Sequence, residues 1–516
     1  MTPSRRVVLV CNAHIDPVWL WPWEEGLAAT LATFRAAAEL CQEFDGFVFC
    51  HNEALLYRWV EEHEPILFER IGRLVREGRW HVCGGWFLQP DCNLPSGESF
   101  VRQITTGLRY FANRFGVRPR VAFNVDAFGH SRGLVQILAK SGFTGYLFCR
   151  PDPRHLTLPS DDFVWVGYDG SSLLAHRSAE HYNSELGRAR VKVERWLEAH
   201  ADDDDGLVLW GVGNHGGGAS REDLRALAAL TDGTPDRQVV HGRPEEYFER
   251  LEAKRAALPR VGRDLNPWAP GCYTSMSTVK RPHRRLEARV FTAEKMCAAA
   301  AIQGLLEYPS ARLDEALEAL LFAQFHDVLA GTSIEEVEAQ AVQRLGHGLE
   351  IADRLRARAF FALLAGEPKA GEGEYPLFVL NPHPFPVTGT IVCEMQPPEP
   401  NTDPATFLEP VLTGRDGVAV PAQVEKESCN IQMDQRKRIA FRATLAPSAM
   451  CRFSCRLRHL PRPPAHPLRP VSGVFRHRGA DCEADIDGSS GLLVGYRAIG
   501  TSFVDGGAFR PLVLRD

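Results

Sequence analysis

The N-terminal half of the chain alternates short apolar runs with longer amphipathic segments, and this alternation restricts the fold more than any other feature. The apolar runs predict buried strands at Val7–Cys11, Phe47–Cys50, Val121–Val125, Tyr146–Cys149 and Leu207–Val212. Helical spacing lies between them, at Leu27–Glu43, Glu64–Glu77 and Gly97–Phe115. Such alternation favours an α/β domain with a parallel, barrel-like arrangement of strands. Ligands in these folds bind at the carboxyl ends of the strands.

The rest of the chain has a different pattern of apolar residues. Residues from about 280 to 365 have helical spacing, and one predicted helix contains Leu313–Gln324 and stops at Gly331. After a linker at Ala365–Glu374, short β-rich runs separated by prolines predict a β-sandwich without an evident closing element. A chain of 516 residues is too long for one core. We therefore expect an α/β domain at 1–262, a helical bundle at 263–365 and an incomplete β-sandwich at 366–516.

Composition excludes several classes of protein. The net charge of −6, without a clustered basic face, gives no sign of a nucleic-acid partner. The thirteen cysteines are scattered and odd in number, which favours reduced thiols and a cytoplasmic location. The apolar run after Arg5 and Arg6 is too short for a signal peptide, and no stretch suits a membrane span. We also expect a homo-oligomer.

Two polar side chains follow the first predicted strand. His14 and Asp16 are two residues apart, so they project to the same side of an extended backbone. An imidazole nitrogen and a carboxylate oxygen aimed together suit a divalent metal ion. The alternative is that His14 forms only a local hydrogen bond, because a His-x-Asp pair alone is a weak signal.

A later predicted strand also ends at a carboxylate. Asp126 follows Val121–Val125, Gly129 permits a tight turn, and the segment after Ser131 has helical spacing. Asp126 is therefore a second candidate ligand at the end of a strand. The alternative is that Asp126 caps the following helix, although Ser131 can serve as that cap.

The third piece is the pair His326-Asp327, at the end of the helix predicted before Gly331. His326 on its own could be only a favourable partner for the helix dipole. Together with His14, Asp16 and Asp126 it gives two imidazoles and two carboxylates from separate segments, which predicts a zinc site.

Aromatic side chains close to these segments indicate a carbohydrate ligand. Trp19, Trp21 and Trp23 follow the His-x-Asp pair. Trp19 is the best candidate to stack on a sugar, whereas Trp21 and Trp23 fit ordinary packing. A metal beside a sugar can hold ring hydroxyls, and cleavage of a glycosidic bond requires two carboxyl-type groups astride it.

These segments resemble the α-mannosidases of glycoside hydrolase family 38. His14–Trp19 is similar to the HxDPxW opening of that family, Asn124–Ser131 to its DxFGHS nucleophile motif, and Gln324–Ser333 to its QFHDxLPGTS segment. Pro90–Ser99 is similar to the PDxNLPSGES stretch of the cytosolic and bacterial branch. Leu380–Pro382 resembles the start of the β-domain of the family. The resemblance covers nearly the whole chain, in the expected order.

The resemblance implies roles for particular residues. It implies a zinc ion, for which Co²⁺ can substitute, bound by His14, Asp16, Asp126 and His326. Asp126 is also the implied nucleophile, and two displacements at the sugar give net retention of the α configuration. The implied substrate-binding residues are Trp19, Asp91 and Asp327.

The sequence departs from the family pattern at two places. Relatives carry GxGDxGGGPT where this chain has Gly211–Ser220, so Asn214 replaces the Asp that aligns with the general acid. Asn214 cannot donate a proton as a carboxylic acid does, whereas His215 can, so His215 is the catalytic candidate and the sequence leaves the identity of the acid open. Gly216–Gly218 predict a tight loop that a ligand can approach, and no Lys follows them as in a phosphate loop. Relatives also continue further, so we expect this chain to be truncated at its C-terminus.

The resemblance predicts a retaining zinc-dependent α-mannosidase that hydrolyses terminal α-D-mannosidic bonds of oligosaccharides or mannosides. One alternative is a metal-dependent carbohydrate deacetylase, which would use metal-activated water in place of a carboxylate nucleophile. The other is a mannoside-binding protein without catalytic activity, which the substitution at Asn214 favours.

Overall fold

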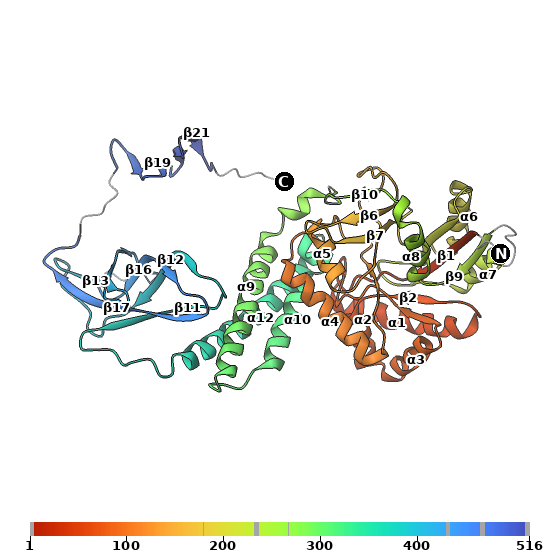
Figure 1. The fold of residues 1–516 in the computed structure, drawn as a ribbon, viewed down its shortest axis with the longest axis horizontal. Helices are drawn as coiled ribbons and strands as arrows, with labels where there is room; N and C mark the ends of the chain where they lie inside the picture. The colour runs from red at the N-terminus through yellow and green to blue at the C-terminus, as the bar shows by residue number, and fades with distance from the viewer. Residues whose placement is uncertain are drawn as a thin grey trace. The chain divides into compact units, whose positions relative to one another are not determined.

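The apolar runs of the N-terminal half form strands in two separate five-stranded sheets. The protein is described by a computed structural model that covers residues 5–178, 180–231, 237–266, 268–429, 434–464 and 470–510. The chain divides into two compact units, Met1–Ala365 and Gly366–Asp516. Both sheets lie in the first unit (Figure 1).

The first sheet is centred on the predicted N-terminal strand. Its strands are β1 (Arg5–Asn12), β2 (Phe49–His51), β3 (Trp80–Val82), β8 (Asp205–Trp210) and β9 (Arg237–His241). β1 pairs in parallel with β2, β8 and β9, so residues 7–12 are buried. This burial on both faces explains why the run is continuously apolar.

The second sheet is mixed. Its strands are β4 (Val121–Phe123), β5 (Gly145–Phe148), β6 (Asp162–Val166), β7 (Ser172–Arg177) and β10 (Arg260–Val261). β6 and β7 form an antiparallel pair, and the other pairs are parallel. One hydrophobic core contains side chains from both sheets, including Val10, Leu209, Phe123 and Leu147. The predicted α/β class is confirmed, with the strands divided between two sheets.

Helices connect and cover these strands. They are α1 (Trp23–Glu43), α2 (Ala54–His63), α3 (Pro65–Arg76), α4 (Gly97–Phe115), α5 (Gly133–Lys140), α6 (Ala189–Ala199), α7 (Arg221–Thr231) and α8 (Pro244–Ala253), with short 3₁₀ turns η1 (Arg255–Ala257) and η2 (Pro270–Tyr273). Within the described ranges, every helix is too short or too polar to span a lipid bilayer.

The predicted helical region contains α9 (Ser277–Ile302), α10 (Ser310–Ala323), α11 (His326–Ala330) and α12 (Glu335–Leu363). α9, α10 and α12 pack side by side (Figure 1). The prediction of one helix that runs on to Gly331 was wrong. α10 ends at Ala323, and Gly331 caps the separate helix α11 with a positive φ of 79°. His326 therefore lies at the start of a helix, not at its end.

The second unit is built from antiparallel sheets. The four-stranded sheet has β11 (Tyr375–Asn381), β17 (Ala449–Leu460), β13 (Phe407–Thr413) and β14 (Ala419–Val420), and the three-stranded sheet has β12 (Val387–Met395), β16 (Lys437–Leu445) and β15 (Ala422–Glu425). Their apolar faces share one core around Phe441, Phe453 and Leu412, as in a sandwich. A further sheet has β18 (Val474–Arg478), β19 (Cys482–Asp487), β20 (Leu493–Ala498) and β21 (Thr501–Ala508).

Candidate metal centre and active site

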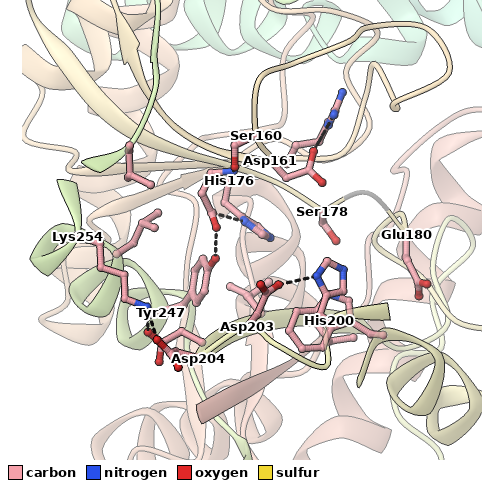
Figure 2. A pocket seen from close by; sticks show the side chains of 18 of the residues that line it. Ser160, Asp161, His176, Ser178, Glu180, His200, Asp203, Asp204, Tyr247 and Lys254 are labelled. Atoms are coloured by element: carbon pink, nitrogen blue, oxygen red, sulfur yellow. Dashed lines mark hydrogen bonds and ion pairs between the residues drawn. The ribbon is translucent and has the colours of Figure 1, made fainter. Parts of the chain in front are cut away.

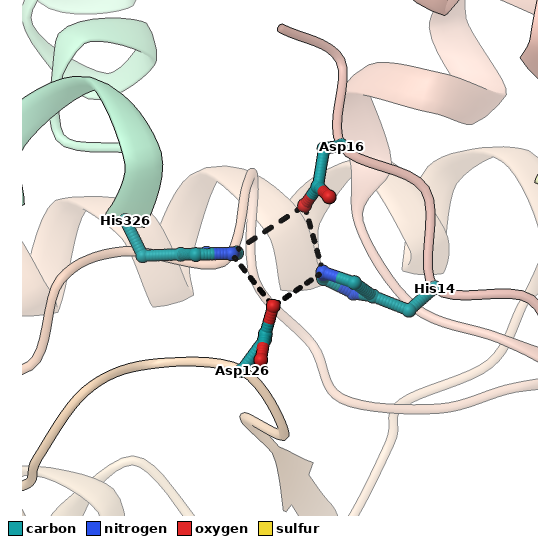
Figure 3. Close-up of side chains that lie close together, drawn as sticks. All are labelled: His14, Asp16, Asp126 and His326. Atoms are coloured by element: carbon teal, nitrogen blue, oxygen red, sulfur yellow. Dashed lines mark ion pairs between the residues drawn. The ribbon is translucent and has the colours of Figure 1, made fainter. Parts of the chain in front are cut away.

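Four buried side chains converge in the first unit. One ligand atom from each of His14, Asp16, Asp126 and His326 lies within 4.8 Å of the others. The carboxylate of Asp16 is 2.8 Å from His14 Nε2 and 3.5 Å from His326 Nε2. Asp126 Oδ2 is 3.9 Å from each of these two nitrogens. Figure 3 shows the four groups pointing toward one centre from three chain segments.

The local fold places each group. His14 and Asp16 follow the carboxyl end of β1, where Asp16 N–H donates to the carbonyl of Asn214 at 2.9 Å. Asp126 follows β4, and it does not cap α5, because Ser131 Oγ accepts from Gly133 N–H instead. The carboxyl ends of strands thus supply three of the four groups.

The fourth group comes from the helical region. The chain breaks between α10 and α11, and Gln324 there accepts a hydrogen bond from Asp91 N–H at 2.9 Å. This pairing with the loop of the α/β region places His326 at the N-terminus of α11. A helix N-terminus does not stabilise a protonated imidazole, so the interpretation of His326 as a dipole partner is wrong.

The donor set fits a divalent cation. His14 Nε2, Asp16 Oδ1 and His326 Nε2 are buried and have no hydrogen-bond partner, although they lie close together. Burial lowers the pKa of His326, but the carboxylates of Asp327 and Asp16 raise this pKa to about 10. Burial raises the pKa of Asp16, but His14 and His326 hold the pKa at about 2. A cation bound by two nitrogens and two oxygens would displace the imidazole protons and neutralise the carboxylates.

Two residues that the sequence did not single out hold Asp126. Arg150 forms an ion pair with Asp126 Oδ1, and the Tyr182 hydroxyl donates to Asp126 Oδ2 at 3.3 Å. The Arg150 guanidinium also lies 4.4 Å from the ring centroid of Trp268. Arg150 follows the predicted strand β5, so its position at the carboxyl end of a strand could have marked it as a site residue. Tyr182 follows β7, a strand that was not predicted, so no pattern in the sequence pointed to this residue.

The predicted substrate-binding residues have different surroundings. Trp19 is half-buried, and its ring meets that of Trp21 edge-on at 5.6 Å. Asp327 is buried beside the cluster, with Oδ2 3.6 Å from His326 Nε2. Burial raises the pKa of Asp327 to about 7. Asp91 is fully buried, and its Oδ1 accepts from the N–H groups of Asn93 and Leu94. Contact of these three residues with a substrate stays a prediction.

Asn214 and His215 point in different directions. The Asn214 side-chain oxygen also lies against the Tyr182 hydroxyl, which shares its one proton between this oxygen and Asp126 Oδ2. The His215 ring is half exposed, lies 4.3 Å from the ring of Trp21, and has Nε2 at 2.7 Å from Glu25 Oε1. His215 therefore lies beside a carboxylate at the accessible side of the Trp21 ring.

A cavity of about 350 Å³ lies between β6, β7, β8 and α8, away from the four converging groups. Asp162 accepts from Tyr247 OH at 2.6 Å and from His176 Nδ1 at 2.7 Å. Figure 2 shows Tyr247 and His176 among the lining side chains. None of the four converging groups lines this cavity. Among the described residues, His14, Asp16, Asp126 and His326 form the one group of three or more His, Cys, Asp or Glu side chains whose ligand atoms lie close enough to share a metal ion.

Two models of known protein families match the chain. Residues 4–270 match the model of the glycosyl hydrolases family 38 N-terminal domain, and residues 268–363 match that of the alpha mannosidase middle domain. The chain belongs to glycosyl hydrolase family 38. The buried His and Asp cluster lies in the parts of the chain that these two family models cover.

Several members of the family are similar in sequence. Alpha-mannosidase G of Dictyostelium discoideum is 31% identical over 338 residues, which is 64% of this chain and 31% of that protein. Human alpha-mannosidase 2C1 is 30% identical over 385 residues, which is 72% of this chain and 36% of that protein. The chain therefore spans about a third of the length of these family members.

A solved family structure has the same fold. The crystal structure of an alpha-mannosidase from Enterococcus faecalis V583 matches with a TM-score of 0.78 and 17% identity, over 97% of this chain and 61% of that one. This match supports the predicted order of an α/β region, a helical region and antiparallel sheets.

Proposed function

We propose that the protein is a retaining, zinc-dependent α-mannosidase that hydrolyses terminal α-D-mannosidic bonds of oligosaccharides or mannosides. The observation that carries this proposal is the convergence of His14, Asp16, Asp126 and His326 in a chain of family 38. Two nitrogens and two oxygens suit Zn²⁺, and Co²⁺ accepts the same donors. The bound ion would hold sugar hydroxyls and help distort the ring.

Asp126 is the nucleophile in this proposal. One of its oxygens attacks the anomeric carbon, and the bond to the leaving oxygen breaks as that oxygen takes a proton from an acid. Water then attacks the same carbon, gives a proton to the conjugate base, and releases Asp126. Arg150 and Tyr182 keep the carboxyl group oriented through both steps, because each holds one of its oxygens.

His215 is the proposed acid. Its Nε2 lies at 2.7 Å from Glu25 Oε1, and this contact orients the ring. Asn214 has no acidic proton to give, and Tyr182 holds its side chain. Trp19, Asp91 and Asp327 are the proposed substrate-binding residues.

The test is proton NMR of an aryl α-mannoside during cleavage by the zinc-loaded protein. Initial release of α-mannose supports retention, and release of β-mannose contradicts it. A fluorinated mannosyl fluoride should leave a covalent sugar on the peptide that contains Asp126. Mannoside binding without turnover would instead support a protein without catalytic activity. The family assignment opposes the deacetylase alternative, which predicts acetate release and no labelled peptide.

The proposal also includes the cellular location, the domain limits and the oligomeric state. The thirteen cysteines are all free, and all but the exposed Cys429 are buried or half-buried, which supports a reducing, cytoplasmic location. The limits of the two family models, near residue 270 and at residue 363, support domains at 1–262, 263–365 and 366–516. A homo-oligomer is proposed as well, and the molar mass in solution tests it.

A further inference from the structure

Gln89 contacts both histidines of the cluster on the side away from the other ligands. Its backbone carbonyl accepts from His326 Nδ1 at 3.1 Å and from His326 N–H at 3.3 Å. Its side-chain nitrogen lies 3.2 Å from His14 Nδ1. Gln89 is completely buried, so water does not compete for these contacts.

Gln89 is itself fixed from two directions. Its side-chain oxygen accepts from the N–H of Val125, the residue before Asp126, at 3.0 Å. Its backbone N–H donates to the buried carboxyl group of Glu53 at 3.1 Å. One residue therefore links the segments that carry His14, Asp126 and His326.

These contacts differ in what they do for the two rings. An imidazole that binds a metal through Nε2 carries its proton on Nδ1, and that proton needs an acceptor. The carbonyl of Gln89 provides one for His326. At His14 the side-chain nitrogen of Gln89 faces Nδ1, because the side-chain oxygen is turned toward the N–H of Val125. The nitrogen that faces His14 instead favours a proton on Nε2, the ligand atom.

We propose that Gln89 is a positioning residue that sets the metal affinity of this centre. Its backbone carbonyl favours the His326 tautomer with the proton on Nδ1, which leaves Nε2 free to bind a metal. Its side-chain amide favours the His14 tautomer with the proton on Nε2, which opposes metal binding. The inference rests on the proposed function, since it takes the cluster as a metal site. A carboxylate at this position has two oxygens, so it can accept from Val125 N–H and from His14 Nδ1–H together.

The test compares dissociation constants for Zn²⁺, measured by competition with a fluorescent chelator, in three variants. Gln89→Met keeps the volume and the backbone carbonyl that accepts from His326 but removes the amide that faces His14 Nδ1, so it should tighten binding by roughly tenfold. Gln89→Glu should bind Zn²⁺ at least as tightly as the wild type. Gln103→Met is the matched control, because buried Gln103 bridges Leu88 and Leu321 and contacts none of the four ligands.

A general loss of packing would weaken binding in Gln89→Met and Gln103→Met alike, and this outcome overturns the inference. Equal affinity in the wild type and both Gln89 variants overturns it too. The visible spectrum of the Co²⁺ form gives a second readout, which should shift in the Gln89 variants and not in Gln103→Met. If the wild type binds no Zn²⁺ at all, the proposed function fails first, and the inference fails with it.

Discussion

The carboxyl group of Asp126 faces two demands, because it lies among the proposed metal ligands and must also attack the sugar. Arg150 contacts Oδ1 and Tyr182 contacts Oδ2, so the two oxygens of the carboxyl group have different surroundings and can serve different roles. Asp126→Asn should therefore remove turnover of aryl α-mannoside and weaken Zn²⁺ binding by at least about tenfold. Rate and chelator-competition measurements test both effects. A variant with near-normal turnover on an activated mannoside would refute the nucleophile assignment.

The contact between His215 and Glu25 makes a prediction about leaving groups. Loss of a general acid slows poor leaving groups by roughly 10²- to 10⁴-fold and activated ones much less. His215→Ala should follow this pattern in kcat/KM for methyl and dinitrophenyl α-mannosides. Glu25→Gln should show a smaller loss of the same pattern, and its exposed neighbour Glu24→Gln should show none. Equal losses on both substrates would reject His215 as the acid.

The buried ring of His130 makes stability depend on pH. Its Nε2 donates to the Arg150 carbonyl at 2.7 Å, and its Nδ1 accepts from the Tyr146 hydroxyl at 2.7 Å. Burial lowers the pKa of His130 from 6.5 to about 4. Between these two values the unfolded chain binds the proton and the folded chain does not, so stability falls as pH falls. The full loss from this group is about 3 kcal/mol.

Denaturant unfolding between pH 7 and pH 4 measures this effect. His130→Asn should unfold more easily at neutral pH and should lose less stability on acidification. The exposed His63→Asn is the control and should keep the slope of the wild type. An unchanged slope in His130→Asn would show that this ring does not contribute. Buried His51, His241 and His283 contribute in the same direction, because burial lowers each pKa to about 4.

At the scale of elements, α4 must lie close to the loop that leads to Gln89. A Cβ atom on Gly107 would come closer than 3.0 Å to the backbone of Gly85 and Trp86. Gly107→Ala should therefore destabilise the first unit by about 1–3 kcal/mol, despite the better helix propensity of alanine. Gly72→Ala in α3 has room and should stabilise by up to about 1 kcal/mol. Urea unfolding of both variants tests the contrast, and equal effects would contradict it.

The sequence predicted the elements whose patterns are long or fully buried. The residues of α4 and the buried run of β1 both have an unambiguous period. β3 and β10 have three and two residues, too few to show any period. The break before His326 was missed because apolar residues continue through it, and pairing with residues 89–91 imposes the break. Tertiary contacts of this kind leave no local signal.

The four candidate metal ligands could be predicted from the sequence, but the residues that contact and orient them could not. The residue pattern and the family motifs both pointed to the four converging side chains; three of them follow predicted strands, whereas His326 begins a helix whose start was not predicted. Gln89 and Glu53 have no distinguishing local pattern, because their importance comes from contacts between segments that lie far apart in the chain. Only the folded arrangement of the loops reveals such residues.

At the scale of the whole molecule, the proposed metal joins distant parts of the first unit, since its ligands follow β1 and β4 and begin α11. None of these ligands lies in Gly366–Asp516. A ligand at 100 times its dissociation constant stabilises the folded state by about 2.7 kcal/mol. Removal of Zn²⁺ by a chelator should therefore lower the Tm of the first unit by several degrees. It should leave the unfolding of the second unit unchanged.

Differential scanning calorimetry of the intact chain separates these transitions. His326→Ala, which removes the one ligand from the helical region, should abolish the response of the first transition to chelator and leave the second where it was. His347→Ala is the matched control, because exposed His347 lies on α12 and contacts Glu315. This control should keep the full chelator response. A chelator response confined to the second transition, or one that survives in His326→Ala, would mean that the ion binds elsewhere.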